Sequence, residues 1–201
     1  MNDLMHQKAG NTPLDPDELA GLRYKHVSTH EELNQLEHAN IQQGLEWLSR
    51  QRSPQVLTEQ YVRELHRQLF GGVWLWAGEF RQTEKNIGID PIMISIELRQ
   101  IMDNTAYWVE HNTYPALETT ARYHHRMLQI HPFPNGNGRF ARIITNELQR
   151  LIGTPLTNWV ANVSEADMPA HRKAYIDALR AADAHNYEAL FTFMQSVTKQ
   201  S

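Results

Sequence analysis

Apolar residues recur at three- and four-residue intervals along most of this chain, and that spacing restricts the fold more than any other feature. Between residues 31 and 50, for example, Leu33, Leu36, Ile41, Leu45 and Leu48 follow helical spacing. The same pattern predicts a helix from Thr58 to the glycines at 71 and 72, and further helices over residues 95–111, 117–129, 139–151, 168–182 and 186–198. The predicted fold class is therefore all-α, or mainly α.

Residues 73–96 depart from the helical pattern. Gly78, Gly88 and Pro91 mark turns in this segment, and β-branched side chains surround the last two. The segment is predicted to be a loop followed by a small β-hairpin. A strand edge of this kind would offer main-chain pairing to an extended peptide.

The bulk composition is that of a globular protein. The 201 residues suffice for one domain with a sizeable core, and 41% of them are hydrophobic. A net charge of −4 argues against a surface that coats nucleic acid, so no direct nucleic-acid binding is expected. No stretch approaches the roughly 20 apolar residues of a membrane helix. The lack of cysteine and of a secretory pattern favours a cytoplasmic location, and residues 1–21 are expected to form a loose N-terminal arm.

The segment 131–142, HPFPNGNGRFAR, carries the strongest chemical signal. Gly136 and Gly138 permit a turn whose successive N–H groups converge on an anion, and the helix that follows adds its own unpaired N–H groups. Arg139 and Arg142 lie three residues apart, on one face of that helix, and suit the outer phosphates of a nucleotide. His131 precedes the turn and is the candidate general base.

Each of these features has a simpler explanation when it stands alone. A histidine before proline is usually structural, and a Gly-Asn-Gly turn or a pair of arginines is usually part of a solvated surface. His124, His125 and His131 could suggest a metal cluster, but adjacent helical positions point in different directions, which favours structural roles. The aromatic residues Trp74, Trp76 and Phe80 fit the core better than an adenine site.

The combination of spacings resembles a known family. HPFPNGNGRFAR is similar to the Fic (Fido) motif HPFx(D/E)GNGRxxR at every fixed position except Asn135. The resemblance extends to Trp76-Ala77-Gly78-x-x-Arg81 and to the run 123–126. It is closest to the subgroup named mobile mystery protein B, through the segments 12–15, 32–34, 40–41 and 86–88. It implies a Fido fold, a helical bundle with a β-hairpin flap, over residues 22–201 with a motif core of about 58–194.

The resemblance also implies roles for individual residues. His131 would deprotonate a target hydroxyl, and Phe133 would anchor the loop. Ile87, Gly88 and Ile89 would belong to the flap that docks the target. The nucleotide-binding residues, which would hold the phosphates of ATP, are Asn135, Gly136, Asn137, Gly138, Arg139 and Arg142.

The departure at Asn135 concerns the metal. The family usually places a carboxylate there to hold Mg²⁺ or to orient the nucleotide. Asn135 would be the metal ligand of this chain, and its amide oxygen is neutral and a weaker ligand for a hard cation. The resemblance therefore implies Mg²⁺ beside ATP with reduced affinity for the metal.

Regulation is implied by a further family motif. Many Fic proteins are inhibited by the glutamate of an (S/T)xxxE(G/N) helix, which pairs with the second motif arginine, here Arg142. Glu32 matches that motif in part, and Glu37 lies in the same predicted helix with a poorer match in letters. The subgroup resemblance also implies a companion helix-turn-helix protein, which would act as an antitoxin.

The predicted function is a Fic-type protein adenylyltransferase that moves AMP from ATP to a Tyr, Ser or Thr hydroxyl of a protein target, including itself. The Gly138-Arg139 pair matches the AMP-transferring pattern. A different hypothesis is a catalytically weak nucleotide-binding or interaction module of a toxin–antitoxin-like pair. A third keeps the enzyme and changes the donor to UTP, to a phosphocholine nucleotide or to ATP as a phosphate donor.

Overall fold

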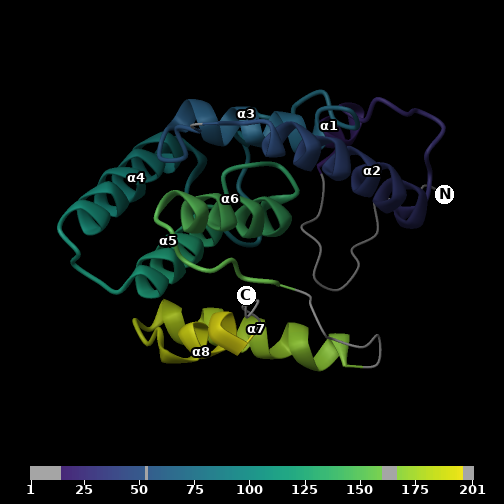
Figure 1. The fold of residues 1–201 in the computed structure, drawn as a ribbon. Coiled ribbons are helices and arrows are strands. Elements are labelled where there is room, and N and C mark those ends of the chain that lie inside the picture. The colour runs from purple at the N-terminus through teal and green to yellow at the C-terminus, as the bar shows by residue number, and fades with distance from the viewer. Residues whose placement is uncertain (1–14, 53, 160–166, 197–201) are drawn as a thin grey trace.

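The computed structural model describes residues 15–52, 54–159 and 167–196. Within these ranges the chain is helical, as the apolar spacing predicts (Figure 1). The helices are α1 (Pro16–Ala20), α2 (His30–Ser49), α3 (Glu59–Phe70), α4 (Ile94–Glu110), α5 (Ala116–Ile130), α6 (Asn137–Leu151), α7 (Met168–Asp183) and α8 (Glu188–Ser196), with a 3₁₀ turn η2 (Pro91–Met93) before α4. The end of the last predicted helix, 197–198, lies outside the described residues.

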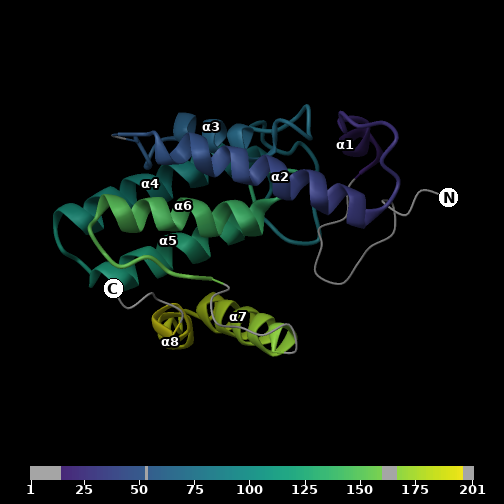
Figure 2. The same ribbon diagram turned by 45° about the vertical axis from the view of Figure 1, so that its right-hand side comes forward.

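The helices form layers around α6. α2 packs along α3 on one side of α6, α5 packs on α6 from another side, and α4 packs on α5 and α3 (Figures 1 and 2). α7 and α8 pair with each other as a separate outer layer. The faces of α6 are buried through Phe140, Ala141, Ile144 and Leu148, which explains why this helix occupies the centre.

Two apolar clusters hold the layers together. The larger one joins α2, α3, α4, α5 and α6 around Leu65, Leu69, Phe70 and Leu98. The smaller one attaches α7 and α8 to α5, and it includes Tyr175 and Leu190. Since both clusters include residues of α5, this helix links the outer layer to the main body. No helix in the described part of the chain is both long and apolar enough to cross a membrane.

The expected β-hairpin is wrong. Residues 83–90, called the flap below, contain no strand, and an isolated β-bridge joins Leu22 to Trp74 elsewhere in the chain. The reason is the guanidinium of Arg81, which donates to the carbonyls of Thr83 and Ile89 within the flap. These carbonyls therefore bind a buried cation rather than the N–H groups of a partner strand.

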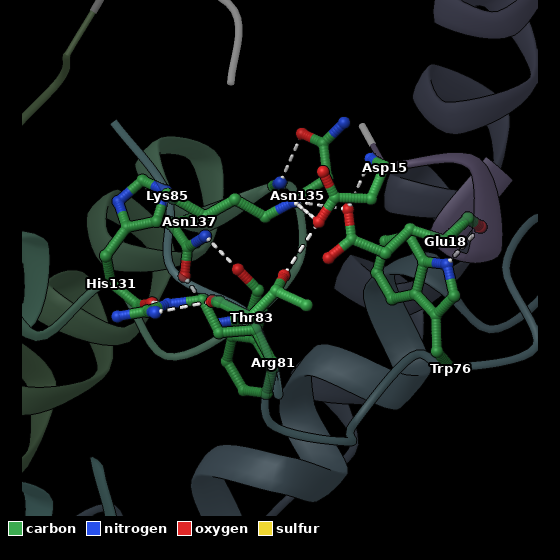
Figure 3. A network of polar contacts seen from close by, with 11 residues as sticks. Asp15, Glu18, Trp76, Arg81, Thr83, Lys85, His131, Asn135 and Asn137 are labelled. Carbon is green, nitrogen blue, oxygen red and sulfur yellow. Dashed lines mark hydrogen bonds and ion pairs between the residues drawn. The ribbon is translucent and has the colours of Figure 1, made fainter. Parts of the chain in front are cut away.

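The expected loose arm is wrong for its last part. Residues 16–20 form α1, and the rest of the arm, 1–14, lies outside the described residues. α1 is fixed to the flap because the Lys85 ammonium contacts the carboxylates of Asp15 at 2.9 Å and Glu18 at 2.5 Å. Thr83 donates a further hydrogen bond to Asp15, at 2.7 Å (Figure 3).

Gly44 sets the separation of α2 from α3. A Cβ atom at this position would lie 2.8 Å from the Gln68 carbonyl oxygen, which is backbone and cannot move aside cheaply. Asn40, one turn earlier, uses its side chain to donate to the same carbonyl and to accept the Gly72 N–H. The two helices therefore touch at backbone distance where Gly44 faces α3.

We expect Gly44→Ala to lower the free energy of unfolding by about 1 to 3 kcal/mol, because overpacking costs more than a helical alanine gains. Gln42→Ala, on the solvent side of the same helix, is the matched control and should change stability by less than about 0.5 kcal/mol. Urea unfolding of both variants measures this. A stabilised Gly44→Ala protein would contradict the close packing of α2 on α3.

Candidate functional site

The loop that joins α5 to α6 is sharply bent at both ends. His131 follows the last residue of α5 in the left-handed region, with φ 51°, and Gly136 precedes α6 with φ 79°. α6 begins at Asn137, two residues earlier than the pattern predicts, so the Gly-Asn-Gly segment runs into its first turn. The loop thus delivers the free N–H groups of a helix start next to His131.

Asn137 closes this loop with both ends of its side chain. Its Oδ1 accepts the Phe133 N–H at 2.9 Å, and its Nδ2 donates to the Phe133 carbonyl at 2.7 Å. Asn137 is buried, and Phe133 is fully buried below it. The Asn137 side chain is therefore occupied within the loop, and its main-chain N–H is the group that remains for a ligand.

His66 of α3 fixes the other half of the loop. It accepts the Gly78 N–H at Nδ1, at 3.0 Å, so Nε2 carries the proton and donates to the Asn135 carbonyl at 3.1 Å. Its ring stacks on Phe133 with centroids 3.6 Å apart. Burial lowers the pKa of His66 to about 3, which keeps the ring neutral. The sequence gives no sign of this role, because a lone histidine inside a helix carries no signal for it.

His131 is buried and neutral. Burial, and then the nearby Arg81 cation, lower the pKa of His131 to about 4. Arg81 donates from Nε to the His131 carbonyl at 2.7 Å, so the same guanidinium holds both His131 and the flap (Figure 3). At neutral pH the imidazole is therefore in the form that accepts a proton.

The flap lies directly against His131. A Cβ atom at Gly88 would come within 2.9 Å of the His131 Cβ and 2.7 Å of Arg81, and Gly88 has φ 112°. Only glycine allows this approach and this conformation. The structure therefore brings Gly88 of the expected target-docking residues to the candidate base. The neighbouring Ile87 is exposed, and Ile89 is partly buried against the core.

Gly136 and Gly138 differ in whether the fold requires a glycine at their position. A Cβ at Gly136 would lie 2.6 Å from the Phe70 ring, and its positive φ already disfavours other residues. Gly138 has no positive φ, and a Cβ there would meet nothing within 4 Å. The fold requires Gly136 but places no demand on Gly138, whose missing side chain leaves open space at the start of α6.

Arg139 is held by Glu37 of α2. The Arg139 guanidinium lies 2.7 Å from one carboxylate oxygen of Glu37, and Trp74 Nε1 donates to the other oxygen, also at 2.7 Å. Glu37 is only 2% exposed. Glu32, the other candidate inhibitory glutamate, is exposed and instead caps α2 by accepting the N–H groups of Ser28 and Thr29.

Arg142 has a different environment from Arg139, although both belong to α6. Its guanidinium carbon lies 4.9 Å from the centre of the Tyr175 ring of α7. The motif resemblance implies a glutamate on the second arginine, but the described residues place Glu37 on the first. The site therefore contains one arginine bound to a carboxylate and one stacked on an aromatic ring.

Asn135, His124 and His125 each have separate contacts. Asn135 is partly buried, and its Oδ1 accepts the N–H of Gly136 at 2.6 Å. His124 and His125 contact Tyr175 and Asp183, respectively, rather than His131. Within the described ranges no three His, Asp or Glu residues form a group that could hold a metal ion.

The aromatic residues are core residues, as predicted. Trp74 is completely buried and Phe80 nearly so, and Trp74 stacks on Trp76 with ring centroids 4.8 Å apart. Trp76 Nε1 donates to the Glu18 carbonyl at 2.8 Å, which ties α1 to the same cluster (Figure 3). The stacking of Trp74 and Trp76 on each other therefore belongs to the packing of the core.

The chain is similar in sequence and in fold to known Fic proteins. The protein adenylyltransferase Fic of Drosophila grimshawi is 31% identical over 103 residues, and that of Aedes aegypti is 25% identical over 149 residues. These alignments cover 49% and 72% of this chain, but the chain spans only 21% and 28% of those relatives. The crystal structure of BepC from Bartonella tribocorum with bound AMPPNP is 18% identical, with a TM-score of 0.71 over 93% of this chain and all of that one, and thus shares the fold.

A family model identifies the part of the chain that carries the likeness. Residues 56–149 match the Fic/DOC family, and they include α3, the flap, α4, α5, the loop and nearly all of α6. The motif resemblance, the helical fold and this match agree with one another. The chain therefore carries a domain of the Fic/DOC family over residues 56–149.

Proposed function

We propose that this protein is a Fic-type adenylyltransferase, which moves AMP from ATP to a hydroxyl of a protein. The observation that carries the proposal is the open space at Gly138, at the start of α6 and in the same loop as the buried neutral base His131. The fold does not need a glycine at position 138. We therefore assign the need for glycine to a ligand that approaches the backbone there. The curated relatives are named protein adenylyltransferases, which supports the same conclusion.

In the proposed reaction, His131 takes the proton of a Tyr, Ser or Thr hydroxyl of the target. The hydroxyl oxygen forms a bond to the α-phosphorus of ATP, and the bond from that phosphorus to the bridging oxygen of the β-phosphate breaks. Pyrophosphate leaves, and AMP remains on the target. The pKa of about 4 leaves the His131 imidazole unprotonated at neutral pH, so it can accept this proton.

The phosphates would lie over the start of α6. The main-chain N–H groups of residues 136–138 would bind their oxygens, and Arg139 and Arg142 would bind the β- and γ-phosphates. Mg²⁺, when bound with ATP, would neutralise phosphate charge. Asn135 fits as one neutral oxygen ligand, because its Oδ1 has a second lone pair beyond the one that accepts Gly136.

The target would dock on the flap. Ile87 is 53% exposed, and Ile92, Met93 and Ile96 continue the exposed apolar surface into η2 and α4. A target segment that lies along the flap would pass Gly88, the residue next to His131. The flap would thus place the hydroxyl, while the loop and α6 place the nucleotide.

We also propose that Glu37 restrains the enzyme. Arg139 cannot bind phosphate fully while its guanidinium is paired with a buried carboxylate, and the buried anion would repel the nucleotide. A companion helix-turn-helix protein would be a separate regulator. The second candidate function is a weak nucleotide-binding module. The Glu37–Arg139 ion pair and the neutral side chain of Asn135 both favour it, because both would weaken binding of the nucleotide and its metal.

Gly138→Ala tests the main proposal. The free energy of unfolding of the variant should be at least that of wild type, because a Cβ atom at position 138 meets nothing and alanine favours the helix. ATP affinity and target labelling should fall about tenfold or more, which corresponds to roughly 1.4 kcal/mol of lost phosphate contact. Isothermal calorimetry and labelling from ATP measure this.

Gly136→Ala is the matched comparison. Its left-handed conformation alone costs an alanine roughly 1 to 2 kcal/mol, so this variant should lose stability. If Gly138→Ala binds and transfers like wild type, the open space at the start of α6 is not the nucleotide site. Labelling from the γ-phosphate but not from the α-phosphate would make the protein a phosphotransferase instead.

Glu37→Gln tests the restraint. The amide keeps the shape and the Trp74 contact but removes the charge that holds Arg139. We expect ATP to bind about tenfold more tightly, as the loss of roughly 1.4 kcal/mol of competition implies, and target labelling to rise. Glu32→Gln is the control and should change neither. Unchanged or weaker ATP binding by Glu37→Gln would assign Glu37 a purely structural role.

A further inference from the structure

The two motif arginines differ in how their charge is balanced. Arg139 is paired with Glu37 at 2.7 Å, whereas no carboxylate of the described residues forms a salt bridge with Arg142. The Arg142 Nε is buried and has no hydrogen-bond partner among these residues. What contacts the Arg142 guanidinium is the ring of Tyr175, 4.9 Å from its central carbon.

The hydroxyl of Tyr175 has a defined direction. Thr145 donates its hydroxyl hydrogen to the Ala141 carbonyl at 2.7 Å, so its oxygen accepts from His124 Nδ1 at 2.9 Å. The proton of the neutral imidazole is then on Nδ1, and Nε2 must accept the Tyr175 hydroxyl hydrogen at 2.7 Å. The Tyr175 oxygen then keeps its lone pairs as acceptors for a nearby cation. Burial raises the pKa of Tyr175, and the Arg142 cation opposes this by a smaller amount.

Within residues 15–52, 54–159 and 167–196, the groups that contact Arg142, directly or through Tyr175, are neutral. Burial, and then the Arg142 cation, lower the pKa of His124 to about 3, so this histidine carries no charge at neutral pH. Tyr175 is 6% exposed and keeps its proton. Neutral dipoles can orient a guanidinium but cannot cancel its charge, so Arg142 retains its full attraction for an anion.

We infer that Tyr175 is a positioning residue, which holds Arg142 ready for the terminal phosphate of ATP. This inference rests on the proposed function, in which Arg142 binds that phosphate. Tyr175 belongs to α7 and lies outside residues 56–149, the part that matches the family model. The outer helical layer thus contributes to the nucleotide site through α6. Arg142 is preorganised without an ion pair to any described carboxylate, whereas Arg139 must leave Glu37.

The test uses Tyr175→Phe, which keeps the ring beneath Arg142 and removes the hydroxyl. Calorimetry with ATP and with ADP should show ATP affinity reduced about fivefold to tenfold, because the hydroxyl dipole that orients Arg142 is lost, and ADP affinity nearly unchanged. The matched control is Tyr187→Phe on α8, whose hydroxyl lies 3.4 Å from His125 Nδ1 and does not contact Arg142. It should bind both nucleotides like wild type.

A second measurement separates positioning from support of the fold. In a protein that already carries Arg142→Ala, Tyr175→Phe should have no further effect on ATP affinity, because the hydroxyl acts through Arg142. The Arg142 Nε–H signal in ¹⁵N NMR should exchange slowly with water in wild type and faster in Tyr175→Phe, without any nucleotide present. Equal losses for ATP and ADP, or a full effect of Tyr175→Phe in the Arg142→Ala protein, would overturn the inference.

Failure of the proposed function has a different signature. If wild type binds ATP and depends on Tyr175 as described, yet labels no target, adenylyl transfer is wrong and the positioning role stands. If wild type binds ATP no more tightly than ADP, and Tyr175→Phe changes neither, Arg142 does not meet the terminal phosphate. That result would overturn the positioning role even in a protein that transfers AMP.

Discussion

The side chain of Asn137 closes the 133–137 segment on itself, and the position of the loop depends on that closure. By bonding to both main-chain groups of Phe133, it satisfies buried polar atoms that would otherwise each cost about 1 to 3 kcal/mol. Phe133 can then enter the core, where His66 stacks on it and binds the Asn135 carbonyl. The loop is thus fixed from within and from α3 before any ligand binds.

A fixed loop gives the surrounding elements a defined surface to contact. Arg81 binds the His131 carbonyl and the flap carbonyls with one guanidinium, so the base and the flap cannot move independently. α1 holds the flap from the other side through Lys85. α2 and α7 each hold one arginine of α6, the first through a carboxylate and the second through an aromatic ring. Helices on opposite sides of α6 therefore influence the same proposed nucleotide site in different ways.

The sequence predicted the helices and the loop well, since both leave local signals. The predicted helix at 117–129 differs from α5 by one residue at each end, because apolar spacing identifies the buried face of a helix directly. The hairpin was wrong because the contacts of one buried arginine replaced strand pairing in the flap. Glu37 and Arg139 are 102 residues apart, so no local pattern could identify which glutamate meets which arginine. Tyr175 and His66 gave no signal either, because their roles depend on helices that meet only in the folded chain.

The most direct test of the account is the mass of the product. Glu37→Gln protein is incubated with ATP and Mg²⁺ in a lysate of the source cells, and peptides are analysed by mass spectrometry, with the Glu37→Gln, His131→Ala double variant as control. The account predicts peptides that carry AMP on a Tyr, Ser or Thr hydroxyl, and their absence with the double variant, because His131 is the proposed acceptor of the hydroxyl proton. AMP-bearing peptides in equal amount from the double variant, or phosphate in place of AMP, would contradict it.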